Sequence, residues 1–76
     1  MASWREQVAN SVSLLINAAS VAGAVLIINA ADIRTRANLV KSNSSDSSSV
    51  EASEIARKIR DEIKQKRPDI TISGSL

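Results

Sequence analysis

The sequence predicts an all-α fold, an antiparallel helical hairpin whose copies assemble into a helical array. Three observations lead to this prediction. No proline occurs before Pro68, apolar residues recur at spacings of three and four from residue 8 to residue 40, and a Ser-rich stretch separates two helical patterns. Because the chain has 76 residues, it has room for one small unit, which we expect to span residues 1–76 without separate domains.

The first helix is predicted over residues 3–41. Ser3 and Glu6 have the spacing of a capping box, in which the Ser3 hydroxyl accepts a hydrogen bond from the Glu6 amide. Beside the main apolar row, a second row occupies positions 14, 18, 21, 25 and 28. A helix that is apolar on nearly every side has to be buried on nearly every side, and we expect that one partner helix in the same chain does not cover it.

Residues 42–49 (SNSSDSSS) are predicted to form a loop, because Ser, Asn and Asp favour turns and helix caps. A second capping box, Ser48 to Glu51, then opens a shorter charged helix over residues 50–66, which Pro68 ends. The rest of the chain is expected to be an extended tail. The second helix has a narrow apolar stripe, made of Ala52, Ile55, Ala56, Ile59 and Ile63.

The hairpin register places Lys41 near Val50, so the second helix covers only the C-terminal half of the first. Residues 4–25 are then a bare apolar arm, which has to enter either lipid or an assembly with other copies. Such assembly also replaces the disulfide or zinc ion of many small domains, since Cys and His are absent. We therefore predict a subunit interface formed by Val8, Val12, Leu14, Leu15, Ala19, Val21, Ala22, Val25, Leu26, Ile28 and Ile33.

The same composition argues against an enzyme. The chain has no His, Cys or Tyr, so the commonest general bases and nucleophiles are missing. Its two glycines, Gly23 and Gly74, do not form a glycine-rich phosphate loop. We expect no catalytic residue, no cofactor and no metal site.

The uncharged residues 7–31 leave a membrane alternative open. Their number, 25, is enough to cross a bilayer, and the basic residues that follow suit the cytoplasmic side. Polar residues inside this segment favour a densely packed protein array instead, since they fall on one stripe at positions 10, 13, 17 and 20. The alternative is a single-span membrane protein or a filament subunit of pilus or filamentous-phage type. A coat subunit would also associate transiently with the membrane before assembly.

Basic side chains gather near the loop. Arg34, Arg36 and Lys41 precede it, and the hairpin register brings Arg57 and Lys58 close to them. Together with the free amides at the start of the second helix, they form a candidate site for the phosphates of double-stranded DNA, without sequence specificity. The competing interpretation is a solvated helix face, because acidic residues lie among the basic ones. A second choice for DNA contacts is the cluster of Lys64, Lys66 and Arg67.

Asn43, Ser44 and Ser45 form an N-glycosylation acceptor pattern. A glycan on Asn43 requires the loop to face the outside of an assembly, whereas phosphate binding at Lys41 requires it to face the inside. If both surfaces are used, Lys64, Lys66 and Arg67 become the better DNA contacts.

The whole pattern resembles a known family. A long first helix containing AASVAGAVLIINAA, then RTRANLVK, a Ser-rich turn and the charged helix EIARKIRDEIKQKR are similar to the major virion protein of clavaviruses, rod-shaped viruses of hyperthermophilic archaea. The resemblance implies a glycosylated helical-hairpin subunit that polymerises through apolar interfaces into a helical capsid around double-stranded DNA. It does not assign individual DNA contacts, and the expected location of the chain is the virion.

Overall fold

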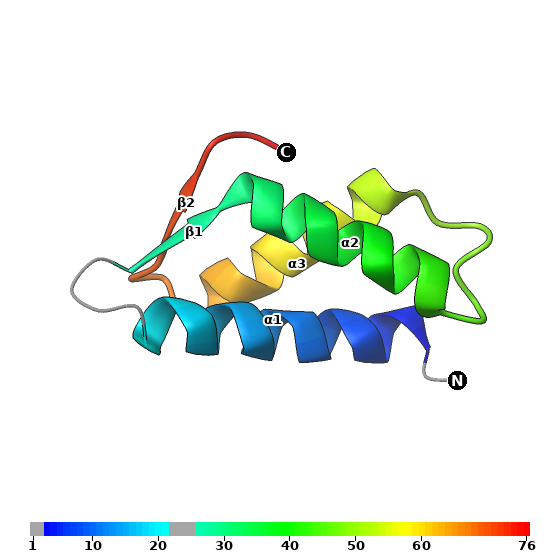
Figure 1. The fold of residues 1–76 in the computed structure, drawn as a ribbon, viewed down its shortest axis with the longest axis horizontal. Coiled ribbons are helices and arrows are strands. Elements are labelled where there is room, and N and C mark those ends of the chain that lie inside the picture. Colours follow the sequence, from blue (N-terminus) through cyan, green and yellow to red (C-terminus); the bar gives the residue numbers. More distant parts are fainter. Residues whose placement is uncertain (1–2, 22–25) are drawn as a thin grey trace.

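The computed structural model describes residues 3–21 and 26–76. In chain order it contains helix α1 (Trp4–Val21), strand β1 (Ile27–Asn29), helix α2 (Ala30–Asn43), helix α3 (Ala52–Lys66) and strand β2 (Thr71–Ser73). The three helices lie side by side, with α1 and α3 running opposite to α2, and the strands pair at the end of the bundle where α2 begins (Figure 1). The all-α prediction is therefore confirmed in part: the described residues are mostly helical, but they form three helices rather than two and include a small parallel strand pair.

The prediction of one continuous helix over residues 3–41 is wrong. Helix α1 ends at Val21, and Ile27–Asn29 is a strand. The side chain of Asn29 then starts a new helix, because its Oδ1 atom accepts a hydrogen bond from the amide of Ala31 at 2.9 Å. The helices therefore fold back on each other, and the molecule is 38 Å long where a single helix would measure about 58 Å.

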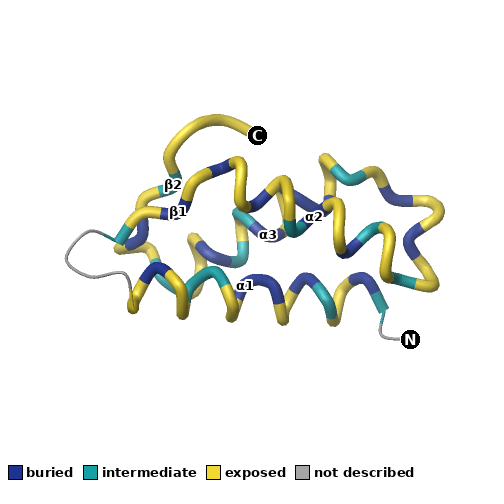
Figure 2. The backbone as a smooth tube through the Cα atoms, in the orientation of Figure 1, coloured by how far each residue is buried: buried dark blue, intermediate teal, exposed yellow. Residues whose placement is uncertain are grey.

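The main predicted apolar row contributes much of the core of this bundle, whereas the second row is exposed at positions 14, 18 and 21. The row of positions 8, 12, 19, 30, 33, 37 and 40 is buried along α1 and α2, although those helices point in opposite directions. Four of the five predicted stripe residues of α3 are also buried, and Ala52 is half-buried. Figure 2 shows these buried positions on the sides of the helices that face one another. The apolar surface of α1 is thus covered mainly by its own chain, because α2, α3 and the strand pair pack around the core.

The two strands hold the C-terminal tail, whose extended form was predicted. They are parallel and in register, with Ile27 opposite Thr71 and Ile28 opposite Ile72. The amide of Thr71 also donates to the Leu26 carbonyl at 2.9 Å. A parallel pair needs a long crossover, which here consists of α2 and α3. Gly74 follows β2 in the left-handed region at φ 87°, where a residue with a side chain is strained.

The predicted loop and second helix agree with the structure to within two residues. Helix α2 runs to Asn43 and α3 covers Ala52–Lys66, so the connection is 44–51. The capping box at Ser3 is confirmed, because the Glu6 amide donates to the Ser3 hydroxyl at 3.2 Å. The second capping box is wrong: Glu51 itself is the N-cap of α3, and its side chain makes no capping hydrogen bond.

Candidate functional site

The predicted interface residues separate into two groups in the structure. Most of the apolar side chains face the interior, because α1 packs against both α2 and α3. These positions are covered within a single chain, which corrects their assignment to contacts between subunits: Val8, Val12, Ala19, Ile28 and Ile33. Leu15 and Leu26 are half-buried against the same core, and Ala22 and Val25 lie outside the described residues.

The remaining interface candidates, Leu14 and Val21, are exposed. The exposed fraction is 55% for Leu14 and 87% for Val21, and Ile27 of β1 is 47% exposed. Ala18 lies between the first two along the helix and is exposed as well. Ala18 and Ile27 also line an apolar groove of about 210 Å³ between α1 and β1, together with Leu15, Ala19, Ile28 and Asp32. We call Leu14, Ala18, Val21 and Ile27 the α1–β1 apolar patch.

The three first-choice DNA contacts on α2 make hydrogen bonds inside the chain. Arg34 Nη1 donates to the Ser75 carbonyl at 2.6 Å, and Arg36 Nε donates to the hydroxyl of the buried Ser11 at 3.3 Å. Lys41 Nζ donates to the carbonyls of Ser47 and Val50, at 3.0 and 2.6 Å. The predicted proximity of Lys41 and Val50 is confirmed, but the ammonium group holds the loop rather than pointing into solvent.

Replacing Lys41 by methionine therefore tests whether this residue is structural. A methionine keeps most of the apolar stem and removes two charge-assisted hydrogen bonds, so we expect the free energy of unfolding to fall by about 1–3 kcal/mol. Thermal unfolding followed by circular dichroism measures the loss, and the exposed Lys66→Met is the matched control. Equal melting temperatures for the two variants would contradict the structural role.

The basic residues of α3 are mostly free of such contacts. Arg57, Lys58, Lys64 and Lys66 are exposed and make no ion pair within the described part of the chain. Arg67, by contrast, donates from Nη2 to Asp69 Oδ2 at 2.8 Å. This hydrogen bond lowers the pKa of Asp69 and raises the pKa of Arg67. Of the second-choice DNA contacts, the two lysines are thus more accessible than the arginine.

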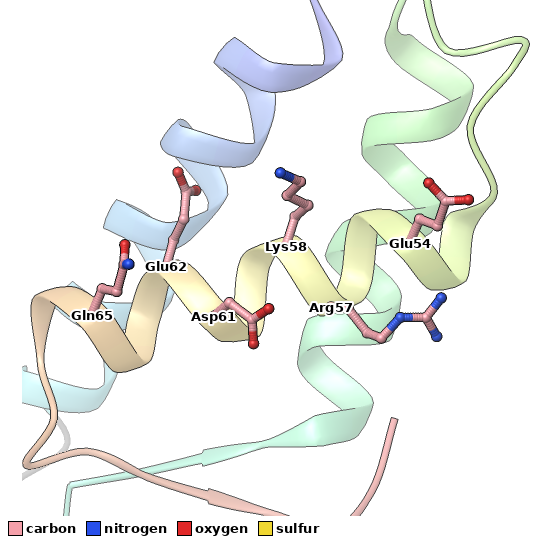
Figure 3. Close-up of a pocket in the computed structure, with 6 residues that line it drawn as sticks. All are labelled: Glu54, Arg57, Lys58, Asp61, Glu62 and Gln65. Carbon is pink, nitrogen blue, oxygen red and sulfur yellow. The ribbon is translucent and has the colours of Figure 1, made fainter.

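A shallow hollow of about 470 Å³ lies along the outer side of α3 (Figure 3). In Figure 3, Lys58 and Glu62 extend to one side of the helix, and Arg57 and Asp61 extend to the other. All of its lining residues are polar and belong to this one helix: Glu54, Arg57, Lys58, Asp61, Glu62 and Gln65. A hollow open along a single helix suits contact with another macromolecule better than enclosure of a small molecule.

The glycosylation candidate Asn43 is exposed and is the last residue of α2. Its carbonyl accepts a hydrogen bond from Gln7 Nε2 at 3.1 Å, which leaves the side-chain amide for modification. The loop beside it is tied to α1, because Asp46 Oδ1 accepts from the Trp4 amide at 2.8 Å. The sequence gives no local signal for this contact, because the two residues are 42 positions apart.

Two classes of site have no support in the described residues. Across residues 3–21 and 26–76, no group of three or more acidic, Cys or His side chains is placed to hold a metal ion. None of the helices in this part of the chain combines the length and the apolar character needed to span a bilayer.

Comparison with known proteins gives no match, since no family model, curated protein or solved structure is significantly similar to this chain. The resemblance to the clavavirus virion protein therefore depends on the sequence segments quoted above.

Proposed function

We propose that this chain is a structural coat subunit that assembles with copies of itself into a rod and holds double-stranded DNA through sequence-independent contacts. The observation that carries the proposal is the α1–β1 apolar patch. Large apolar side chains that are 47–87% exposed next to an apolar groove are typical of an interaction surface. The function is the one implied by the resemblance to the major virion protein of clavaviruses.

The size of the patch favours a polymer over an isolated dimer. Full burial of a Val, Leu or Ile side chain contributes about 1.5–3 kcal/mol, so Leu14, Val21 and Ile27 together offer less than 10 kcal/mol. Association alone costs about 4–15 kcal/mol, and a single such contact is therefore weak. A helical array repeats the contact and adds others on each subunit, which makes assembly strongly dependent on protein concentration.

The DNA part of the proposal is supported by the exposed basic residues of α3. Arg57, Lys58, Lys64 and Lys66 have no internal partner among the described residues, in contrast to the hydrogen-bonded side chains of α2. Trp4, the one aromatic residue of the chain, is buried, so stacking on bases is not expected. Contacts to phosphates carry no sequence information, as packaging of a whole genome requires.

Electron microscopy of negatively stained protein, with and without linear double-stranded DNA, tests the proposal. We expect rods or filaments, and DNA that becomes resistant to nuclease within them. Rods that leave the DNA digestible would favour the alternative of a pilus-type or filamentous-phage-type subunit. A monomer at every concentration, with or without DNA, would overturn the proposed function.

The double variant Leu14→Asp/Val21→Asp tests the patch itself. Two carboxylates cannot be buried without a large desolvation cost, so we expect at least a tenfold rise in the protein concentration at which assembly begins. Arg5→Asp, on the same helix, also exposed and with the same change in net charge, is the matched control and should assemble normally. Sedimentation velocity gives the fraction assembled, and normal assembly of the double variant would remove the patch from the interface.

A further inference from the structure

The outer side of α3 carries a row of four exposed charges with alternating sign. Glu54, Arg57, Asp61 and Lys64 follow one another at spacings of three, four and three, which places them on one face of the helix. The opposite face holds Ile55, Ile59 and Ile63, which are fully buried in the bundle. We call the four charged residues the α3 charge row, and three of them line the hollow in Figure 3.

The α3 charge row is largely unpaired within its own chain. Arg57 and Asp61 have the spacing of an intrahelical ion pair, yet the ion pairs of the described residues are Arg60–Asp61 and Arg67–Asp69. Glu54, Arg57 and Lys64 therefore make no ion pair in this part of the chain. Their charges face solvent and are free to meet opposite charges on another molecule.

We propose that α3 packs antiparallel against α3 of a second copy through this row. The order of charges is negative, positive, negative, positive, and reversing the helix turns it into its own complement. Glu54 then lies opposite the second copy's Lys64, and Arg57 opposite the second copy's Asp61, with each contact made twice around a two-fold axis. A parallel pairing in the same register sets like charge against like charge, so the row also excludes that arrangement.

The proposed α3 pairing depends on the self-assembly proposed above, and it would be one of the interfaces in that assembly. Exposed ion pairs contribute little individually and weaken with salt, so the row fixes orientation and register while apolar contacts such as the α1–β1 patch supply most of the attraction. The pairing also divides the basic residues of α3. Arg57 and Lys64 face carboxylates of the second copy, which leaves Lys58 and Lys66 for DNA phosphates.

A zero-length carbodiimide crosslink between carboxylates and amines tests the pairing. Glu54 and Lys64 are ten residues apart on one straight helix, about 15 Å along its axis, so they cannot form an amide bond within a chain. In a mixture of unlabelled and ¹⁵N-labelled protein at low salt, we expect Glu54–Lys64 peptides that combine one light and one heavy half. Assemblies seen by electron microscopy without this crosslink would overturn the α3 pairing and leave the proposed function standing. Absence of assemblies would overturn both.

A charge swap provides the second measurement. Arg57→Asp or Asp61→Arg alone places like charges opposite each other, and we expect the yield of the Glu54–Lys64 crosslink to fall at least tenfold. The double variant Arg57→Asp/Asp61→Arg restores opposite charges and should recover most of the yield. Arg5→Asp, a charge-matched change on α1, should leave it unaltered. A double variant as poor as either single variant would overturn the pairing.

Discussion

Replacing Ile59 by alanine is expected to lower the free energy of unfolding by about 2–5 kcal/mol. Ile59 lies in the middle of α3, is fully buried, and packs in the core with Ile55 and Ile63. The substitution removes three carbon atoms from a close-packed interior and leaves a cavity that the neighbouring helices fill only in part. Since whole domains are stable by about 5–15 kcal/mol, and small ones by less than most, this one change threatens the fold.

Urea unfolding followed by circular dichroism measures this loss. The experiment is best done in the Leu14→Asp/Val21→Asp background, where association between copies does not add to the apparent stability. Leu39→Ala provides the control, because Leu39 of α2 is 43% exposed and its truncation should cost well under 1 kcal/mol. Equal losses of unfolding free energy at the two positions would mean that the Ile59 face of α3 is not buried in the core of the bundle.

The core was largely predictable because its signal is periodic. Spacings of three and four identified Val12, Ile33 and Ile59 as members of apolar rows, and all three are buried. The same spacing does not say where a row is interrupted. The spacing of three and four continues from α1 into α2 even though the chain reverses direction between them. One long helix and two antiparallel helices therefore give the same sequence pattern in this segment.

The local signal for the break was present in the sequence at Asn29. An Asn followed three residues later by Asp32 has the composition of a helix N-terminus, with a capping side chain and an acid in the first turn. The β-branched pair Ile27 and Ile28 just before it favours a strand. These signals were outweighed by the length of the uncharged segment, which suggested a single apolar rod.

The remaining differences come from contacts between distant residues. The pairing of β1 with β2, the Asp46 cap on α1 and the Arg34 hydrogen bond to Ser75 each join positions more than 40 residues apart. No spacing rule reports such partners, so Arg34 and Arg36 were assigned to DNA when the fold uses them internally. Lys41 was correctly placed beside Val50, but proximity alone did not show that its ammonium group donates to the loop carbonyls. The exposure of a residue also depends on which elements cover it. The sequence prediction gave the first helix one partner helix, so it overestimated the apolar area that other copies would have to cover.

Two variants, Val12→Asp and Leu14→Asp, should distinguish the three-helix bundle from a single long apolar helix. The two positions are two residues apart on α1. Val12 is fully buried, so its replacement places an unpaired carboxylate in the core, and we expect the chain to lose its helical circular dichroism signal at 25 °C. Leu14 is 55% exposed, and its carboxylate stays in water, so this variant should keep the fold and lose affinity for other copies. In a rod whose whole perimeter is covered by neighbours, both changes fall in interfaces and both variants fail to assemble with similar severity. A folded, soluble Val12→Asp monomer would therefore contradict the three-helix arrangement, because no buried position in α1 tolerates such a charge.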